Sequence, residues 1–326
     1  MSRDDKGSSK TKMEHLLAVP LQPAIKNPEI KRTQLFINNE YVDSVSGKTF
    51  DTINPVNEQV ICQVQEGDKA DVDLAVAAAR LAMNRKSTWR TMNPADRGQL
   101  LHKIADIIER NTAYIASLEV LDNGKPYVMA FLDVTTCVSW FRYYAGYCDK
   151  IEGRTLAMED GKMGYTRYEP VGVVGAITPW NFPFLMTSLK LSQCLAAGNA
   201  VVLKPPEQTP LTTLLFGDIA IEAGFPPGVI NIIPGYGPTA GAAISHHPDI
   251  NKVAFTGSTE VGHLIQTASG ESNLKRVTLE LGGKCPLIIS KTADLDIVVP
   301  FAQNACYVNM GQTSVKVLFE TYGRTR

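Results

Sequence analysis

Residues 170–207 read PVGVVGAITPWNFPFLMTSLKLSQCLAAGNAVVLKPPE and carry the clearest structural signal in the chain. The continuous apolar run over residues 171–177 is typical of a strand that is buried on both faces of a parallel sheet. A helix is expected over about residues 184–195, and residues 200–203 then repeat the buried-strand pattern. A strand, a helix and a second buried strand together form one β–α–β unit.

The same alternation continues on the C-terminal side. A helix expected from Pro210 to Ala223 leads to a third strand over residues 229–233. A helix from about Pro238 leads to a fourth strand that starts at Val253. This repetition predicts the α/β class with a doubly wound parallel sheet. Because ligands of such sheets bind at the carboxyl ends of the strands, we expect the functional side chains in the segments that follow them.

The N-terminal residues predict smaller elements around this sheet. Short β-like runs separated by turns between Gln34 and Val64 indicate a small antiparallel layer. Helical periodicity of apolar residues is found in the segments 71–83, 94–110, 112–121 and 129–148. Residues 1–31 are typical of a disordered or loosely attached tail. Residues 150–170 predict a β-hairpin that leaves the body, either as a surface excursion or as an intersubunit edge.

The composition is that of a soluble globular protein, with 44% hydrophobic and 20% charged residues in a chain of 326. A formal net charge of −1 gives no reason to expect a nucleic-acid partner or attraction to an anionic membrane. Apolar runs are too short to span a bilayer, and the polar N-terminus lacks the apolar core of a signal peptide. The 6 cysteines are scattered singly without zinc-site spacing, so we expect no metal site and reduced thiols in a cytoplasmic protein.

The strand that starts at Val253 leads into a candidate anion site. It ends in a turn at Gly257 and Ser258, where a helix begins, and the free N–H groups of a helix N-terminus bind phosphate or other anions. A second strand follows, and Glu280 lies among its apolar residues just before Gly282. We expect this carboxyl group to be partly desolvated and therefore usable as a general base. The alternative is a glycine-rich connection with a surface glutamate.

Three other polar side chains follow predicted strands. Lys204 offers a cation to a phosphate or ribose oxygen, and Glu207 offers a carboxylate to a ribose diol. Because this carboxylate would repel a 2′-phosphate, it favours NAD over NADP, although a GxGxxG segment is absent. Asn181, held between Trp180 and Phe182, is placed to donate to an oxyanion. The alternatives are a solvent-exposed Lys/Glu pair and an asparagine that only forms a turn.

At these residues the chain resembles the NAD-dependent aldehyde dehydrogenases, and among them the cytosolic class that includes the retinal dehydrogenases. The matching segments are PWNFP at 179–183, KPPEQTPLT at 204–212, GFPPGVIN at 224–231, PGYGPTAG at 234–241, FTGSTEVG at 255–262 and LELGGK at 279–284. The resemblance covers about residues 31–290. It implies a homo-oligomeric enzyme that oxidises an aldehyde, retinal-like or another aliphatic or aromatic one, to the carboxylic acid with NAD as cofactor.

The resemblance also implies a role for each site residue. The catalytic positions are Glu280 as general base and Asn181 as side-chain oxyanion donor. The implied cofactor contacts are Lys204 and Glu207 for the adenosine ribose, Ser258 for the pyrophosphate, Trp180 for the nicotinamide end, and further positions at Ile177, Gly237, Gly257 and Gly262.

The nucleophile position departs from the family pattern. The family's cysteine lies in a segment of the form NxGQxC, whereas residues 309–314 read NMGQTS and place Ser314 at that position. In the family a thiolate attacks the aldehyde, hydride passes to NAD, and water activated by the glutamate hydrolyses the thioester. A hydroxyl needs an adjacent base to become nucleophilic, and loss of the nucleophile in another covalent enzyme lowers kcat by on the order of 10⁶. The alternative function is therefore a catalytically impaired NAD-binding pseudoenzyme that associates with full-length relatives.

The domain organisation follows from the resemblance, which implies a catalytic domain that continues far beyond Glu320. We expect a C-terminally truncated chain that leaves apolar side chains such as Phe301, Tyr307 and Val308 uncovered. The expected parts are a tail over 1–31, an NAD-binding domain over 32–149 and 171–281, an oligomerisation hairpin over 150–170, and the start of a catalytic domain over 282–326.

Overall fold

The computed structural model describes residues 19–314 and 317–318, and its centre is a seven-stranded sheet. The strands lie in the spatial order β11 (Arg276–Leu281), β10 (Lys252–Gly257), β7 (Val173–Ile177), β8 (Ala200–Lys204), β9 (Ile230–Ile232), β1 (Leu35–Ile37) and β2 (Glu40–Val42). Strands β7 to β11 are parallel, and β1 and β2 add two antiparallel strands at one edge. The predicted doubly wound parallel sheet is confirmed.

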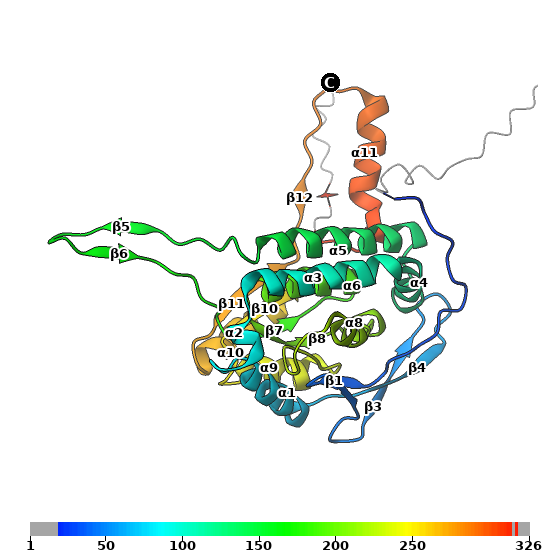
Figure 1. Cartoon of the computed structure of the whole chain (residues 1–326). Coiled ribbons are helices and arrows are strands. Elements are labelled where there is room, and N and C mark those ends of the chain that lie inside the picture. Colours follow the sequence, from blue (N-terminus) through cyan, green and yellow to red (C-terminus); the bar gives the residue numbers. More distant parts are fainter. Residues whose placement is uncertain (1–18, 315–316, 319–326) are drawn as a thin grey trace, which may run out of the picture.

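Helices cover both faces of this sheet (Figure 1). On one face lie α3, α5, α6 and α8, and on the other lie α1, α9 and α10. The helices are α1 (Lys69–Ala82), α2 (Thr88–Thr91), α3 (Pro94–Arg110), α4 (Thr112–Asn123), α5 (Tyr127–Tyr147), α6 (Pro183–Ala196), α7 (Leu211–Leu214), α8 (Phe216–Ala223), α9 (Ala242–His246), α10 (Thr259–Glu271) and α11 (Leu295–Tyr307), with a π-helical turn η2 (Gly237–Gly241) and a 3₁₀ turn η3 (Val308–Gly311). None of the helices described is long and apolar enough to cross a membrane.

Local sequence explains where these elements begin and end. All five residues of β7 and all five of β8 are buried, because helices pack on both faces of the sheet, and all of them except Lys204 at the end of β8 are apolar or glycine. Helix α3 begins with Asn93 accepting a hydrogen bond from Ala95 N, followed by a proline at the first helical position. Helix α4 ends at Gly124, whose φ of 80° lies in the left-handed region that favours glycine.

Two expectations about element boundaries and sheet membership are corrected by the structure. Strands β1 and β2 belong to the main sheet, and only β3 (Thr49–Ile53) and β4 (Val60–Gln65) form a separate antiparallel pair. Strand β1 joins the sheet because its three residues are buried and Phe36 pairs with Ile232 of β9. The single helix expected from Pro210 to Ala223 is divided into α7 and α8 at Leu215.

The expectation of a disordered or loosely attached tail over residues 1–31 is wrong for residues 19–31. Residues 1–18 lie outside the part of the chain that is described, but residues 19–31 are attached to the body. Ile25 N donates to Ser117 Oγ at 2.9 Å, and the Tyr114 hydroxyl donates to Glu29 O at 2.7 Å. Leu21 and Ile30 pack against the core, and this apolar contact explains why the segment does not detach.

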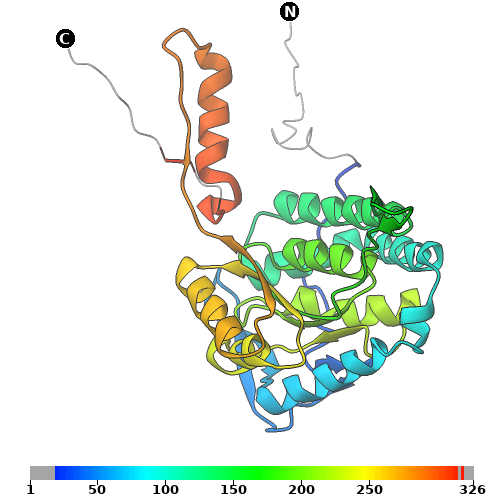
Figure 2. The same cartoon turned by 90° about the vertical axis from the view of Figure 1, so that its left-hand side faces the viewer.

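Two segments extend from the body. The hairpin of β5 (Thr155–Ala157) and β6 (Met163–Tyr165) reaches far from the sheet in Figure 1, as expected for residues 150–170. Figure 2 shows α11 standing away from the body beside the segment that contains β12 (Cys285–Pro286), which pairs with β13 (Val317–Leu318). Ala302 is the buried residue of α11, and Phe301 and Tyr307 are exposed as expected, whereas Val308 is partly buried.

The connection between α8 and β9 provides a stability test. Gly228 has a φ of +79°, and a Cβ atom at this position would lie 2.4 Å from the backbone oxygen of Ala78. We expect Gly228→Ala to lower the free energy of unfolding by about 2 kcal/mol, through backbone strain and this steric conflict. Urea denaturation measures the change. The matched control is Gly146→Ala in α5, where the Cβ atom meets open space, and it should raise stability by about 0.5 kcal/mol. Equal effects of the two substitutions would contradict this account.

Candidate functional site

A cleft of about 790 Å³ lies at the carboxyl ends of the parallel strands. The strand order reverses between β7 and β10, since the chain proceeds from β7 to β8 and β9 on one side and to β10 and β11 on the other. Such a switch point is where open α/β sheets bind ligands. All but one of the sequence-predicted site residues line this cleft, namely Ile177, Trp180, Asn181, Lys204, Glu207, Gly237, Gly257, Ser258, Glu280 and Ser314.

The exception is Gly262. It lies within α10 and is buried, and a Cβ atom there would lie 2.8 Å from a methyl carbon of Leu281. The structure therefore places Gly262 where it allows α10 to pack closely on β11, and it does not place it on the cleft surface. The sequence around Gly262 does not show whether the missing side chain makes room for a neighbouring strand or for a ligand.

The N-terminus of α10 opens into the cleft. Ser258 is the N-cap residue, and its Oγ accepts a hydrogen bond from Val261 N at 3.2 Å. Ser258 and Val261 line the cleft, which is therefore bordered by the N-terminus of α10, where the helix dipole favours an anion. Gly257 precedes it, and a Cβ atom there would lie 2.4 Å from the ring of Phe255. These groups fit the pyrophosphate of a dinucleotide.

Lys204 and Glu207 form a partly buried ion pair, so the alternative of a solvent-exposed pair is excluded. The Lys204 side chain is 4% exposed and its Nζ lies 3.0 Å from Glu207 Oε2. The same Nζ donates to Pro205 O at 2.9 Å and to Gly235 O at 2.6 Å. Burial lowers the pKa of Lys204, and the charge of Glu207 opposes this shift. The ammonium group thus joins the ends of β8 and β9 and holds the Glu207 carboxylate at the cleft.

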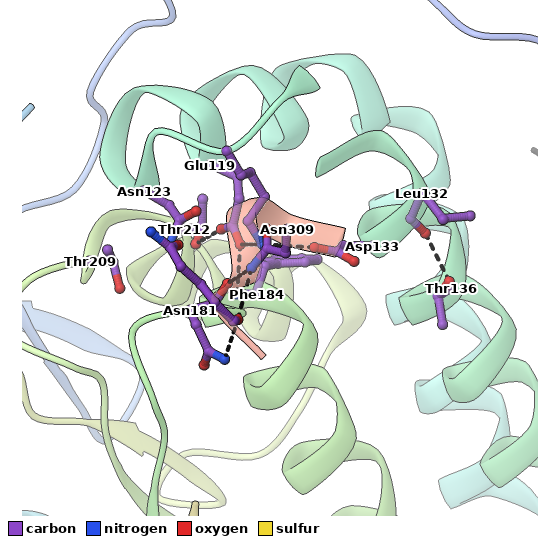
Figure 3. A network of polar contacts seen from close by, with 12 residues as sticks. Glu119, Asn123, Leu132, Asp133, Thr136, Asn181, Phe184, Thr209, Thr212 and Asn309 are labelled. Carbon is purple, nitrogen blue, oxygen red and sulfur yellow. Dashed lines mark hydrogen bonds and ion pairs between the residues drawn. The ribbon is translucent and has the colours of Figure 1, made fainter. Parts of the chain in front are cut away.

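Asn181 is connected to the segment that carries Ser314. Asn181 Nδ2 donates to Gln312 O at 2.8 Å, and the buried Asn309 donates through its Nδ2 to Asn181 O at 3.0 Å (Figure 3). The backbone of η3 has positive φ at Asn309, Met310 and Gly311 and turns the chain into the cleft. Asn309 and Gln312 were not singled out from the sequence, because nothing local predicts hydrogen bonds to a loop about 130 residues earlier.

The environment of Glu280 differs from the expectation. Glu280 is exposed, because β11 is the edge strand of the sheet and its side chains alternate between exposed and partly buried. Partial desolvation of this carboxyl group is therefore not observed. Ser314 is exposed as well, in a turn that follows η3. Both groups nevertheless line the same cleft.

Lys190 is a further titratable group near Glu280 that sequence reasoning missed. It lies on α6, and burial lowers its pKa to about 8 while the carboxylate of Glu280 opposes the shift. A lysine in the helix that follows PWNFP has no local signal of partial burial. Among residues 19–314 no group of three or more His, Cys, Asp or Glu side chains is arranged to hold a metal ion.

The fold and this cleft define an α/β protein with a dinucleotide-type site at the switch point of a parallel sheet. The sequence profile of the aldehyde dehydrogenase family matches residues 41–318. The chain is 59% identical over 288 residues to the mitochondrial aldehyde dehydrogenase of Sus scrofa. It is 56% identical over 289 residues to retinaldehyde dehydrogenase 3 of Homo sapiens. Residues 1–326 therefore belong to a member of the aldehyde dehydrogenase family.

Both alignments cover 88% of this chain but only 55% and 56% of those two relatives, so the chain spans little more than half of their length. The solved structure of an aldehyde dehydrogenase from Bacillus cereus in complex with NAD⁺ superposes with a TM-score of 0.86 at 48% identity. That superposition covers 88% of this chain and 59% of the Bacillus cereus chain.

The lowered pKa of Lys190 gives a pH-dependent prediction. The folded chain loses this proton near pH 8, whereas the unfolded chain keeps it up to about 10.5, so unfolding takes up a proton between these values. The free energy of unfolding should therefore rise by about 3 kcal/mol from this group as pH increases through that range. Lys190→Met should remove the rise, as measured by urea denaturation at several pH values. The control is Lys69→Met, an exposed lysine on α1, and an unchanged slope in Lys190→Met would contradict the assignment.

Proposed function

We propose that the cleft binds NAD and that the chain serves the oxidation of an aldehyde to its carboxylic acid. The observation that carries this proposal is the convergence of an anion-binding helix terminus at Ser258 and a held carboxylate at Glu207 in one cleft. The Bacillus cereus relative was solved with NAD⁺, which supports the same ligand here.

The roles in this proposal follow the geometry. Glu207 accepts hydrogen bonds from the adenosine ribose, and Lys204 acts by positioning Glu207. The N-terminus of α10 receives the pyrophosphate, and Trp180 with Ile177 borders the nicotinamide end. Bound NAD supplies the hydride acceptor.

The catalytic roles are assigned to two side chains of the cleft. The amide of Asn181 has two N–H groups and one of them is used by Gln312 O, so the other is available to an oxyanion. Glu280 activates water as the general base. These roles require a substrate carbon held between Asn181 and residue 314.

A second candidate function is favoured by Ser314. A serine hydroxyl is a poor nucleophile without an adjacent base, and a chain with an intact cofactor cleft but no thiol at this position is an NAD-binding pseudoenzyme. We propose that such a chain associates with full-length relatives through the hairpin over residues 150–170. The NAD-binding domain then consists of residues 32–149 and 171–281, and residues 282–326 begin the catalytic domain.

The substrate and the compartment are proposed at the level of class. A retinal-like or another aliphatic or aromatic aldehyde is consistent with the two relatives, which are a mitochondrial aldehyde dehydrogenase and a retinaldehyde dehydrogenase. We propose a cytoplasmic location from the scattered single cysteines. Fractionation of expressing cells distinguishes the cytoplasm from the mitochondrion.

NAD binding is tested by calorimetry on the purified chain. We expect binding of NAD in preference to NADP, and Glu207→Gln should weaken NAD binding by about tenfold and reduce that preference. Loss of the carboxylate removes both the ribose acceptor and the repulsion of a 2′-phosphate. The control is Glu222→Gln, which removes an exposed glutamate that pairs with Arg110 on the surface of α8. Absence of NAD binding to the unaltered chain would overturn the proposed cofactor.

The nucleophile position is tested by restoring the thiol. We expect turnover with retinal and short aldehydes to be near zero in the unaltered chain and to rise by orders of magnitude in Ser314→Cys, as followed by NADH absorbance. Thr313→Cys is the matched control, because it adds a thiol one residue away in the same segment. Substantial turnover by the unaltered chain would contradict the pseudoenzyme function. No gain in Ser314→Cys would mean that the thiol alone does not restore the reaction.

A further inference from the structure

A lysine without solvent contact lies between two carboxylates behind the cleft. The Lys125 side chain is 0% exposed, and its Nζ lies 2.8 Å from Asp133 Oδ2 and 3.5 Å from Glu119 Oε1. The Glu119 side chain is likewise 0% exposed, and that of Asp133 is 7% exposed. We call these three residues the buried charge cluster. Desolvation makes such a cluster a poor source of stability, so its presence calls for another role.

The cluster has one more negative than positive charge, and the start of α6 balances it. Glu119 accepts a hydrogen bond from Phe184 N at 3.4 Å and another from Thr212 Oγ1 at 2.6 Å. Helix α6 has no side-chain cap of its own and begins with a proline, so Phe184 supplies one of its free N–H groups. Glu119 therefore caps α6 from another helix, where the helix dipole favours its charge.

Residues at the end of α4 and just after it also contact the loop before α6. Asn123 Nδ2 donates to Trp180 O at 2.7 Å, and the Lys125 ammonium lies 4.5 Å from the centre of the Phe182 ring. The loop is thus held at Trp180, at Phe182 and at Phe184, on both sides of Asn181. Figure 3 shows Glu119, Asn123 and Phe184 close to Asn181 and Asn309.

Asn181 is the residue that this arrangement fixes. It has no regular secondary structure around it, and its amide must be aimed at the reacting carbon to stabilise an oxyanion. An error of about 1 Å in such a group lowers rates strongly. Asn309 and Gln312 hold Asn181 from the side of η3. On the other side the cluster holds two positions that follow, through Lys125 at the Phe182 ring and Glu119 at Phe184 N.

We propose that Lys125, with Glu119 and Asp133, is a positioning unit that orients the Asn181 amide toward the reacting centre. None of the three lines the cleft, so each acts through the 180–184 segment. This inference rests on the proposed function of Asn181 as oxyanion donor.

The test variant combines Lys125→Met with Asp133→Asn. Lys125→Met alone would leave two buried carboxylates without a cation and would risk unfolding, whereas the double substitution keeps the net charge of the cluster. The matched control combines Lys69→Met with Asp73→Asn, an exposed lysine–aspartate pair on α1 with the same change of charge.

The first measurement needs neither NAD nor turnover. Hydrogen exchange followed by mass spectrometry should show the peptide over residues 180–186 exchanging about tenfold faster in the test variant. Peptides from β7 and β8 should be unchanged, and the control variant should match the unaltered chain. Unaltered exchange at 180–186, or equal acceleration throughout the sheet, would overturn the positioning role.

The second measurement is a double-mutant cycle in the Ser314→Cys chain. The cluster substitution should lower kcat by about tenfold with little change in NAD affinity, and it should have no further effect once Asn181→Ala is present. A full tenfold effect that persists beside Asn181→Ala would overturn the proposal, because the cluster would then act by another route. Absence of turnover in Ser314→Cys contradicts the catalytic part of the proposed function, and hydrogen exchange then decides the positioning role by itself.

Discussion

The structure depends on how it satisfies the polar groups at the carboxyl ends of its parallel strands. There the last backbone groups of each strand are unpaired, and the N-termini of the following helices lie beside them. At the ends of β8 and β9 this requirement is met by one buried ammonium, since Lys204 donates to Pro205 O, Gly235 O and Glu207. This ammonium satisfies the carbonyl groups of Pro205 and Gly235, so they need no hydrogen bond from a ligand. It also holds the Glu207 carboxylate at the rim of the cleft. The position of the Glu207 carboxylate at the cleft therefore depends on the hydrogen bonds of the Lys204 ammonium.

Local patterns predicted much of the fold and of the site. The buried strands β7 and β8 were predicted because a strand covered on both faces reads as a nearly continuous apolar run. The convergence of Asn181, Glu207 and Ser258 followed from strand polarity alone. The membership of β1 in the main sheet was not predicted, because its partner β9 lies almost 200 residues later. The sequence of a strand of three residues does not indicate which other strand it pairs with.

Contacts between distant segments of the site were not predicted either. Nothing local to Lys204 indicates that its ammonium also donates to the backbone oxygen of Gly235, 31 residues later. Glu280 was expected to be desolvated, but the strand that bears it is an edge. One signal was available and unused, since Glu119 and Asp122 lie on the face of α4 that also buries Ile115 and Leu118. Charged side chains on an apolar helical face must find buried partners, and the first turn of α6 supplies one of them, the N–H group of Phe184.

The projecting helix α11 has a consequence for cooperativity. Its exposed apolar side chains, among them Leu295, Ile297 and Phe301, contribute almost no buried surface. The heat capacity change of unfolding and its dependence on denaturant both scale with the surface that is buried on folding. The region from β12 to η3 therefore contributes less to both quantities than its number of residues would suggest. Helix α11 therefore adds little to the cooperative unfolding of the sheet domain, whereas η3 and the residue after it are held to the body by the hydrogen bonds that join Asn309 and Gln312 to Asn181.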